Sequence, residues 1–280
     1  MVTNAPPTRL LAVVLTAAVA VLLTSATSAG TTVAPDPGPS APAPDPPSPP
    51  PTFGTLPPGS ALPTGDACAA LVADVPEPVP ANAVYNATTG SRVLPAEVFD
   101  PVSNDPRAAA DIASRVDGRY TGTTPQILQW AACKWGVDEK LVRAQAQLES
   151  SWRQAMMGDW TSDPALCAPD HGPGVDGQPG RCPESWGILQ VRYHYFGPAF
   201  PDVIASTAFN VDTAYGIWRA CFEGYEWWLR DTATDPYHPY RAGDALGCAG
   251  RWYSGRWYDR LAERYIYCLR RVMDGRQPCQ

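Results

Sequence analysis

Tryptophan and proline are segregated along this 280-residue chain. All ten tryptophans lie between Trp130 and Trp257, whereas twelve prolines lie between Pro35 and Pro58. A proline-rich stretch stays extended and forms no packed core, while large aromatic side chains require one. The folded mass is therefore predicted in the C-terminal part, where roughly 170 residues suffice for one domain.

The N-terminus has the pattern of an export signal. Arg9 precedes an apolar run from Leu10 to Leu23, and small residues follow through Ala29. We therefore predict a signal peptide over residues 1–29. The run is short for a bilayer-spanning helix, which needs about 20 residues. An uncleaved anchor is the alternative.

Two further segments precede the main domain. Residues 30–59 are rich in Pro, Ala, Ser and Asp and are predicted to form a disordered linker. Residues 60–107 show no sustained periodicity, so we expect an extended arm, with Cys68 as a point where it is tied down. The main domain is predicted over 108–280.

Charge and cysteine content limit the partners and the chemistry. A net charge of −7 disfavours nucleic acid, which binds basic surfaces. Eight cysteines in an exported chain indicate disulfides. We predict one pairing, Cys167 with Cys182, because it would close a loop rich in Gly, Pro and Asp. With three histidines and no CxxC pair, neither a metal nor another cofactor is expected.

The C-terminal part reads as mainly helical. Thr124-Pro125 resembles a cap followed by proline at the first position of a helix over 126–135, which ends at Gly136. Asp138 would cap a second helix over 139–151. Further helices are predicted over 207–229, 243–255 and 258–273.

Glu149 is the residue with the strongest chemical signal. It falls in the last turn of the second helix, between Leu148 and Trp152. Apolar surroundings disfavour a charged carboxylate, so its pKa should rise. A carboxylic acid that stays protonated near neutral pH can donate a proton to a glycosidic oxygen. Lysozyme is the known example of a glutamate whose pKa is raised in this way.

Four motifs together carry a family resemblance over about residues 124–270. They are Glu149-Ser150, the run from Ser185-Trp186 through Gly187-Ile188-Leu189-Gln190, Phe209-Asn210-Val211, and Arg251-Trp252-Tyr253-Ser254-Gly255. Their order resembles lytic transglycosylases and goose-type lysozymes, and more closely exported actinobacterial autolysin-like proteins. The resemblance implies a mainly α, lysozyme-like single domain that follows the extended N-terminal arm.

The resemblance also implies residue roles. Glu149 would be general acid and then general base, and Gly187 would let the backbone approach the sugar. Gln190 would bind an N-acetylated sugar, while Ile188 and Leu189 would line the cleft. Tyr253 would orient Glu149 or the substrate through its hydroxyl, although Ser254 replaces the usual asparagine. Ser185 corresponds to a serine near the acid in relatives.

The reaction type depends on a second carboxylate. A hydrolase needs one, and Glu184 is our first candidate ahead of Asp159, Asp163 and Asp176. Family transglycosylases use one glutamate together with the acetamido group of the substrate, and we favour this mechanism. The expected partner is the peptidoglycan glycan strand, cut at the β-1,4 bond between N-acetylmuramic acid and N-acetylglucosamine by a secreted, wall-associated monomer. A non-catalytic glycan-binding protein and a wall amidase or peptidase are the alternatives.

Overall fold

The computed structural model describes residues 52–99, 105–232 and 237–279. They all belong to one compact unit, Ser48–Gln280. The predicted signal peptide, 1–29, and residues 30–51 of the predicted linker lie outside the described residues.

The described chain is mainly helical, with one small antiparallel sheet. Its α-helices are α1 (Gly65–Ala69), α2 (Ala83–Asn86), α3 (Thr124–Trp135), α4 (Glu139–Ser150), α5 (Tyr193–Phe196), α6 (Asp202–Ala205), α7 (Thr207–Phe222), α8 (Leu229–Thr232), α9 (Ala245–Ser254) and α10 (Arg260–Met273). Short 3₁₀ or π turns are η1 (Pro80–Asn82), η2 (Ala96–Phe99), η3 (Ala108–Ile112), η4 (Ala113–Arg115), η5 (Pro164–Leu166) and η6 (Gly197–Ala199). The strands are β1 (Met157–Thr161), β2 (Cys182–Trp186) and β3 (Val191–Arg192), in the order β1-β2-β3.

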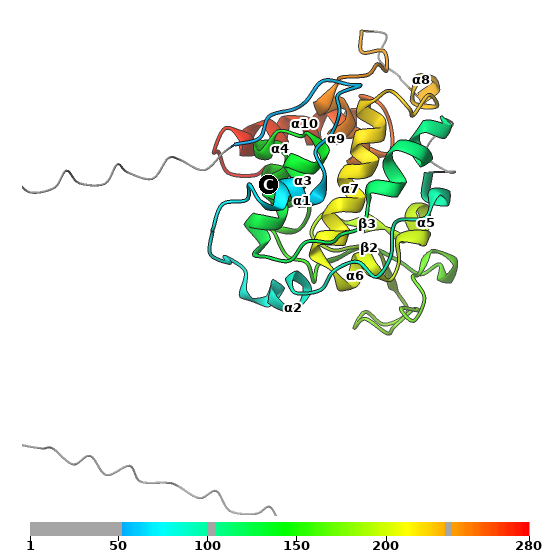
Figure 1. Cartoon of the computed structure of the whole chain (residues 1–280). Coiled ribbons are helices and arrows are strands. Elements are labelled where there is room, and N and C mark those ends of the chain that lie inside the picture. The colour runs from blue at the N-terminus through cyan, green and yellow to red at the C-terminus, as the bar shows by residue number, and fades with distance from the viewer. Residues whose placement is uncertain (1–51, 100–104, 233–236, 280) are drawn as a thin grey trace, which may run out of the picture. The chain divides into compact units, whose positions relative to one another are not determined.

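Helix α7 is the centre of the core. Every one of its 16 residues is buried, and Figure 1 shows it, in yellow, crossing the middle of the helical body. Helices α3 and α9 pack against α7, while α4 packs against α3 and α10. The charged residues of α7 are enclosed as well and are paired, Asp212 with Lys134 and Arg219 with Glu223.

The predicted helices form, with local differences at their ends. The cap of α3 is Thr123, one residue before the expected Thr124, because the Gln126 side chain accepts a hydrogen bond from the Thr123 N–H and so closes the N-terminus there. Helix α7 ends at Phe222, well before the expected Leu229. Gly224 follows in the left-handed region, at φ +86°, and turns the chain away from the helix axis.

The N-terminal segments are built into the domain more tightly than the sequence suggested. The Leu56 N–H donates to the Gly136 carbonyl at 3.0 Å, and the Arg219 guanidinium donates to the Leu56 and Pro57 carbonyls at 3.0 and 2.9 Å. Residues 52–59 therefore differ from the disordered linker that we expected. Their order comes from hydrogen bonds that their own backbone groups make, and such bonds leave no pattern in the side chains of the segment.

The expected arm over 60–107 is likewise part of the packed body. Short helices interrupt it, and Leu94, Val98 and Phe99 join the same buried cluster as the main helices. The Cys68–Cys133 disulfide ties α1 to α3. The packed structure thus begins well before the boundary predicted at residue 108.

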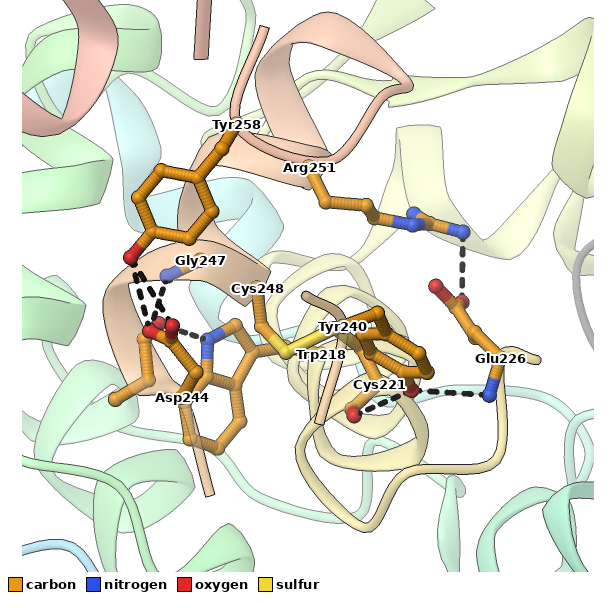
Figure 2. Close-up of a disulfide and its surroundings, with 10 residues drawn as sticks. Trp218, Cys221, Glu226, Tyr240, Asp244, Gly247, Cys248, Arg251 and Tyr258 are labelled. Atoms are coloured by element: carbon orange, nitrogen blue, oxygen red, sulfur yellow. Dashed lines mark hydrogen bonds and ion pairs between the residues drawn. A yellow bond between two sulfur atoms is a disulfide. The ribbon is translucent and has the colours of Figure 1, made fainter. Parts of the chain in front are cut away.

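Four disulfides link the described chain. The predicted Cys167–Cys182 bond is present, and the others are Cys68–Cys133, Cys221–Cys248 and Cys268–Cys279. Cys221–Cys248, which Figure 2 shows, joins α7 to α9. Four disulfides are what an oxidising compartment outside the cytosol permits. Within the described ranges, every helix is too short or too polar to traverse a lipid bilayer.

Candidate active site

The end of α4 fixes the position of Glu149. The helix stops at Ser150 because Ser151 and Trp152 adopt left-handed conformations, with φ of +53° and +64°. The Ser150 hydroxyl then donates to the Ile188 carbonyl at 2.9 Å. This bond joins the last turn of α4 to the Gly187–Gln190 turn, so two of the motifs that the sequence singled out are adjacent.

Glu149 has a direct partner on another helix. The Tyr265 hydroxyl of α10 donates to Glu149 Oε1 at 2.5 Å. Burial raises the pKa of Tyr265 well above its ordinary value, so this hydroxyl stays protonated and remains a donor. One turn earlier on α4, Gln145 accepts a hydrogen bond from Tyr215 at 3.0 Å. The bond from Tyr265 therefore fixes one oxygen of the Glu149 carboxyl group.

The surroundings of Glu149 keep a proton on it up to neutral pH. Its side chain is half-buried, and burial raises its pKa from 4.5 to about 7. The hydrogen bond from Tyr265 acts in the opposite direction, and the negative charge of Asp159 adds to the rise. A carboxyl group with this pKa can give up and take back a proton near neutral pH.

Asp159 is the second carboxylate that acts on Glu149. It lies on β1 at φ +50°, with an exposed side chain. The buried Ser185 hydroxyl donates to Asp159 Oδ2, and Arg192 Nη2 lies 3.2 Å from the same oxygen. Ser185 is directly positioned for this because β2 pairs it with Gly158 of β1. The serine therefore holds the second carboxylate in place.

Our first candidate for that role, Glu184, takes a different position. It lies next to Ser185 on β2, so its side chain leaves the opposite face of the strand. Its Oε2 lies 3.4 Å from Arg192 Nε, and no hydrogen bond from Ser185 holds it, unlike Asp159. Of the remaining candidates, Asp163 caps η5 and Asp176 pairs with His171 at 3.0 Å. The geometry therefore favours Asp159 over Glu184.

Packing inside the domain requires a glycine at position 187. It adopts φ +84°, and a Cβ there would lie 2.1 Å from Asn210 Nδ2 and 2.9 Å from Gln154 Nε2. The glycine thus makes room for two buried amide side chains, whereas we expected it to make room for a sugar. Gln154 accepts from the Ile188 N–H at 3.1 Å, and Asn210 accepts from the Leu189 N–H at 3.0 Å. These two amides clamp the turn.

The rest of the turn points inward. Ile188 and Leu189 are fully buried, so they belong to the core and do not line an open cleft as we expected. Gln190 is half-buried, and its amide donates to the Met156 and Gly187 carbonyls at 3.2 and 2.8 Å. Its donors therefore brace the turn against β1 instead of being turned outward toward a ligand.

Tyr253 reaches Glu149 only through another residue. It is 55% exposed, and its ring stacks on Tyr265 at 4.7 Å with an interplanar angle of 9°. The hydrogen bond that we expected from Tyr253 is made by Tyr265. Tyr253 is therefore an exposed ring stacked on the hydrogen-bond partner of the acid.

Two surface hollows lie away from this cluster. One of about 500 Å³ is bordered by Arg241, Asp244 and Tyr258, and one of about 260 Å³ by Asp138, Leu141 and Asp274. Neither includes Glu149. No set of three or more His, Cys, Asp or Glu side chains in the described ranges is arranged to hold a metal ion.

Comparisons with protein-family models, with curated proteins and with solved structures give no match to this chain. The case for a function accordingly rests on the motifs and on the geometry around Glu149.

Tyr265 is the residue of this site that sequence reasoning missed. A signal for it was present, because Ala262, Tyr265, Ile266 and Leu269 follow the spacing of a buried helix face. A buried tyrosine hydroxyl usually needs a hydrogen-bond partner. Which partner it takes depends on how α10 packs on α4, 116 residues away in the chain.

Proposed function

We propose that this protein is an exported peptidoglycan glycosidase that cleaves the β-1,4 bond between N-acetylmuramic acid and N-acetylglucosamine, with Glu149 as the proton donor. The observation that carries the proposal is a half-buried carboxyl group with a pKa near 7, oriented by Tyr265. Protonation of the leaving oxygen is the step that such a group performs. The motif resemblance supplies the substrate class, and the four disulfides are compatible with export.

Two fates of the sugar cation follow from that first step. With one carboxylate, the acetamido oxygen of the substrate attacks C1 as the leaving oxygen takes the proton of Glu149. The C6 hydroxyl then displaces the acetamido oxygen from C1 and gives its proton back to Glu149, which closes a 1,6-anhydro ring. This is the lytic transglycosylase outcome that the motifs favour. With two, a second carboxylate assists the attack of water. Asp159 is the specific observation that favours this hydrolytic alternative, because its charge acts on Glu149 and its position is fixed by Ser185 and Arg192.

The decisive experiment uses the purified protein and a peptidoglycan suspension. Wild type should clear the suspension, and Glu149→Gln should lower the rate at least about 100-fold while still sedimenting with the wall material. Glu263→Gln on the exposed face of α10 is the matched control and should clear like wild type. Equal clearing by Glu149→Gln would refute the acid assignment, and wall binding without clearing by wild type would favour a non-catalytic glycan-binding protein.

Mass spectrometry of the released fragments separates the two reactions. Anhydro-muramic ends identify a transglycosylase, whereas reducing ends identify a hydrolase. Asp159→Asn should abolish the hydrolytic products but leave anhydro products in place. Cleavage within the peptide instead of the glycan would support the amidase or peptidase alternative.

A further inference from the structure

The 500 Å³ hollow has the features of a ligand site of its own. It lies between the N-terminal end of α9 and α10, and its lining includes Arg241, Asp244, Leu246, Tyr258 and Arg270. Its volume is in the range of pockets that hold small ligands or single units of a polymer. Neither Glu149 nor any residue of the candidate active site borders it.

Two exposed arginines, Arg241 and Arg270, border this hollow, and neither is paired with another side chain in the part of the chain that the structure describes. The structure gives neither Arg241 nor Arg270 a hydrogen bond or an ion pair from its guanidinium group to any described residue. By contrast, the buried Arg219 and Arg251 are paired with Glu223 and Glu226. Burial and the charge of Asp244 raise the pKa of Tyr258, and the charges of Arg270 and Arg241 act in the opposite direction. Both guanidinium groups therefore lie close enough to act on the same hydroxyl.

The negative charge in the hollow is already engaged. Asp244 caps α9, where its Oδ1 accepts from the Gly247 N–H at 2.8 Å. The Tyr258 hydroxyl donates to its two oxygens at 3.2 and 3.1 Å, and Figure 2 shows Gly247 and Tyr258 converging on this carboxylate. A carboxylate at a helix N-terminus is compensated by the helix dipole. The two arginines thus leave an excess of positive charge.

The walls of the hollow are rigid. The Tyr258 ring stacks on His238 at 4.5 Å and meets Trp257 edge-on at 5.3 Å. The Cys221–Cys248 disulfide holds α9 to the central helix. Tyr258 and α9 are therefore fixed before any ligand arrives, and the entropy lost on binding is confined to the exposed side chains of Arg241 and Arg270.

The neighbouring hollow indicates where in the first hollow an anionic ligand group would bind. It shares Ala245, Leu246 and Arg270 with the first but adds Asp138 and Asp274. Two carboxylates beside one guanidinium disfavour an anion there. An anionic group is favoured in the first hollow, which Arg241 and Arg270 both border.

We propose that the hollow bordered by Arg241, Tyr258 and Arg270 is a second ligand site that binds a phosphate or carboxylate group. A guanidinium group presents a planar fork of N–H donors that matches the oxygens of either anion. A phosphodiester unit of an envelope polymer or the carboxylate of a short peptide would supply this chemistry. The site is independent of the proposed glycosidase activity.

Calorimetric titration of the purified full chain at low ionic strength tests the proposal. The probes are glycerol 3-phosphate for the phosphate source and N-acetyl-D-alanine for the carboxylate source. At least one should bind at a single site, and Arg241→Gln with Arg270→Gln should weaken that binding at least about tenfold. Binding should also weaken with added salt, as for exposed charges.

Two control variants make the result specific. Arg260→Gln removes an exposed arginine of α10 that does not border the hollow, and Glu149→Gln removes the candidate acid; both should bind like wild type. Far-UV circular dichroism checks that the double variant is folded, and each single variant provides the same test should the double variant fail. Binding of neither probe at about 10 mM, or unchanged binding by the folded variants, would overturn the proposal. Loss of wall clearing with intact probe binding would affect only the proposed glycosidase.

Discussion

Replacing Glu149 with glutamine should stabilise the fold at neutral pH, because the raised pKa of this residue is also a cost to stability. The variant keeps the shape of the side chain and the oxygen that accepts from Tyr265. What it loses is the ability to ionise. We therefore expect Glu149→Gln to be more stable than wild type above pH 7 and no more stable near pH 4.

The sign and size follow from linkage. The pKa of Glu149 rises from 4.5 to about 7 in the folded state, so the folded protein binds more protons than the unfolded chain between these values. Stability of wild type therefore falls as pH rises through this window. At 1.36 kcal/mol per unit, full burial would correspond to about 3 kcal/mol. Because the half-buried side chain keeps some contact with water, we expect about 1–2 kcal/mol.

Urea unfolding followed by tryptophan fluorescence at pH 4, 5.5 and 7.5 measures the difference between the two proteins. Glu226 is also buried, and burial raises its pKa to about 7, but it titrates in both proteins and cancels from the difference. Glu263→Gln, at an exposed position on α10, should run parallel to wild type. A Glu149→Gln curve that is parallel to wild type across this pH range would show that the carboxyl group is not desolvated, and the acid assignment would lose its basis.

Three further predictions concern the same fold. Tyr265→Phe should move the alkaline limb of the pH–rate profile for wall clearing to higher pH, and Asp159→Asn should move it to lower pH. The reason is that Tyr265 lowers the pKa of Glu149 and Asp159 raises it. Shifts of this limb in the same direction in both variants would contradict these opposite effects on Glu149. Gly187→Ala should cost about 2–4 kcal/mol in urea unfolding because its Cβ would overlap Asn210, while Gly172→Ala, with open space around it, should be nearly neutral; similar costs for both would refute this packing. Replacing Cys68 and Cys133 with alanine should destabilise the protein by about 1.5 kcal/mol more than replacing Cys268 and Cys279, since their sequence separations are 65 and 11; calorimetry that finds the reverse order would reject loop entropy as the cause.

The junction between α3 and α4 was the most predictable part of the fold. Gly136 and Asp138 carry their own local signals, and α3 and α4 end and begin at these residues as expected. The three strands were harder to foresee, because Asp159 breaks β1 with a positive φ and β2 is buried along most of its length. Such strands show no alternation of polar and apolar residues.

The candidate site shows the same division. The position of Glu149 at the edge of an apolar helix face could be read from its neighbours. The inward turn of Ile188 and Leu189 could not, because it depends on the Gln154 and Asn210 amides, which come from distant parts of the chain. Tertiary hydrogen bonds of this kind decide whether a residue in a motif faces a ligand or the core.

The bonds from Arg219 to the carbonyls of Leu56 and Pro57 have a mechanical consequence. Arg219 belongs to the fully enclosed central helix, and Leu56 is bonded to Gly136 as well. A pulling force applied at residue 52 is therefore transmitted through these hydrogen bonds directly to the central helix, and no loosely attached segment has to detach first. A domain tethered through that side would resist tension with its core.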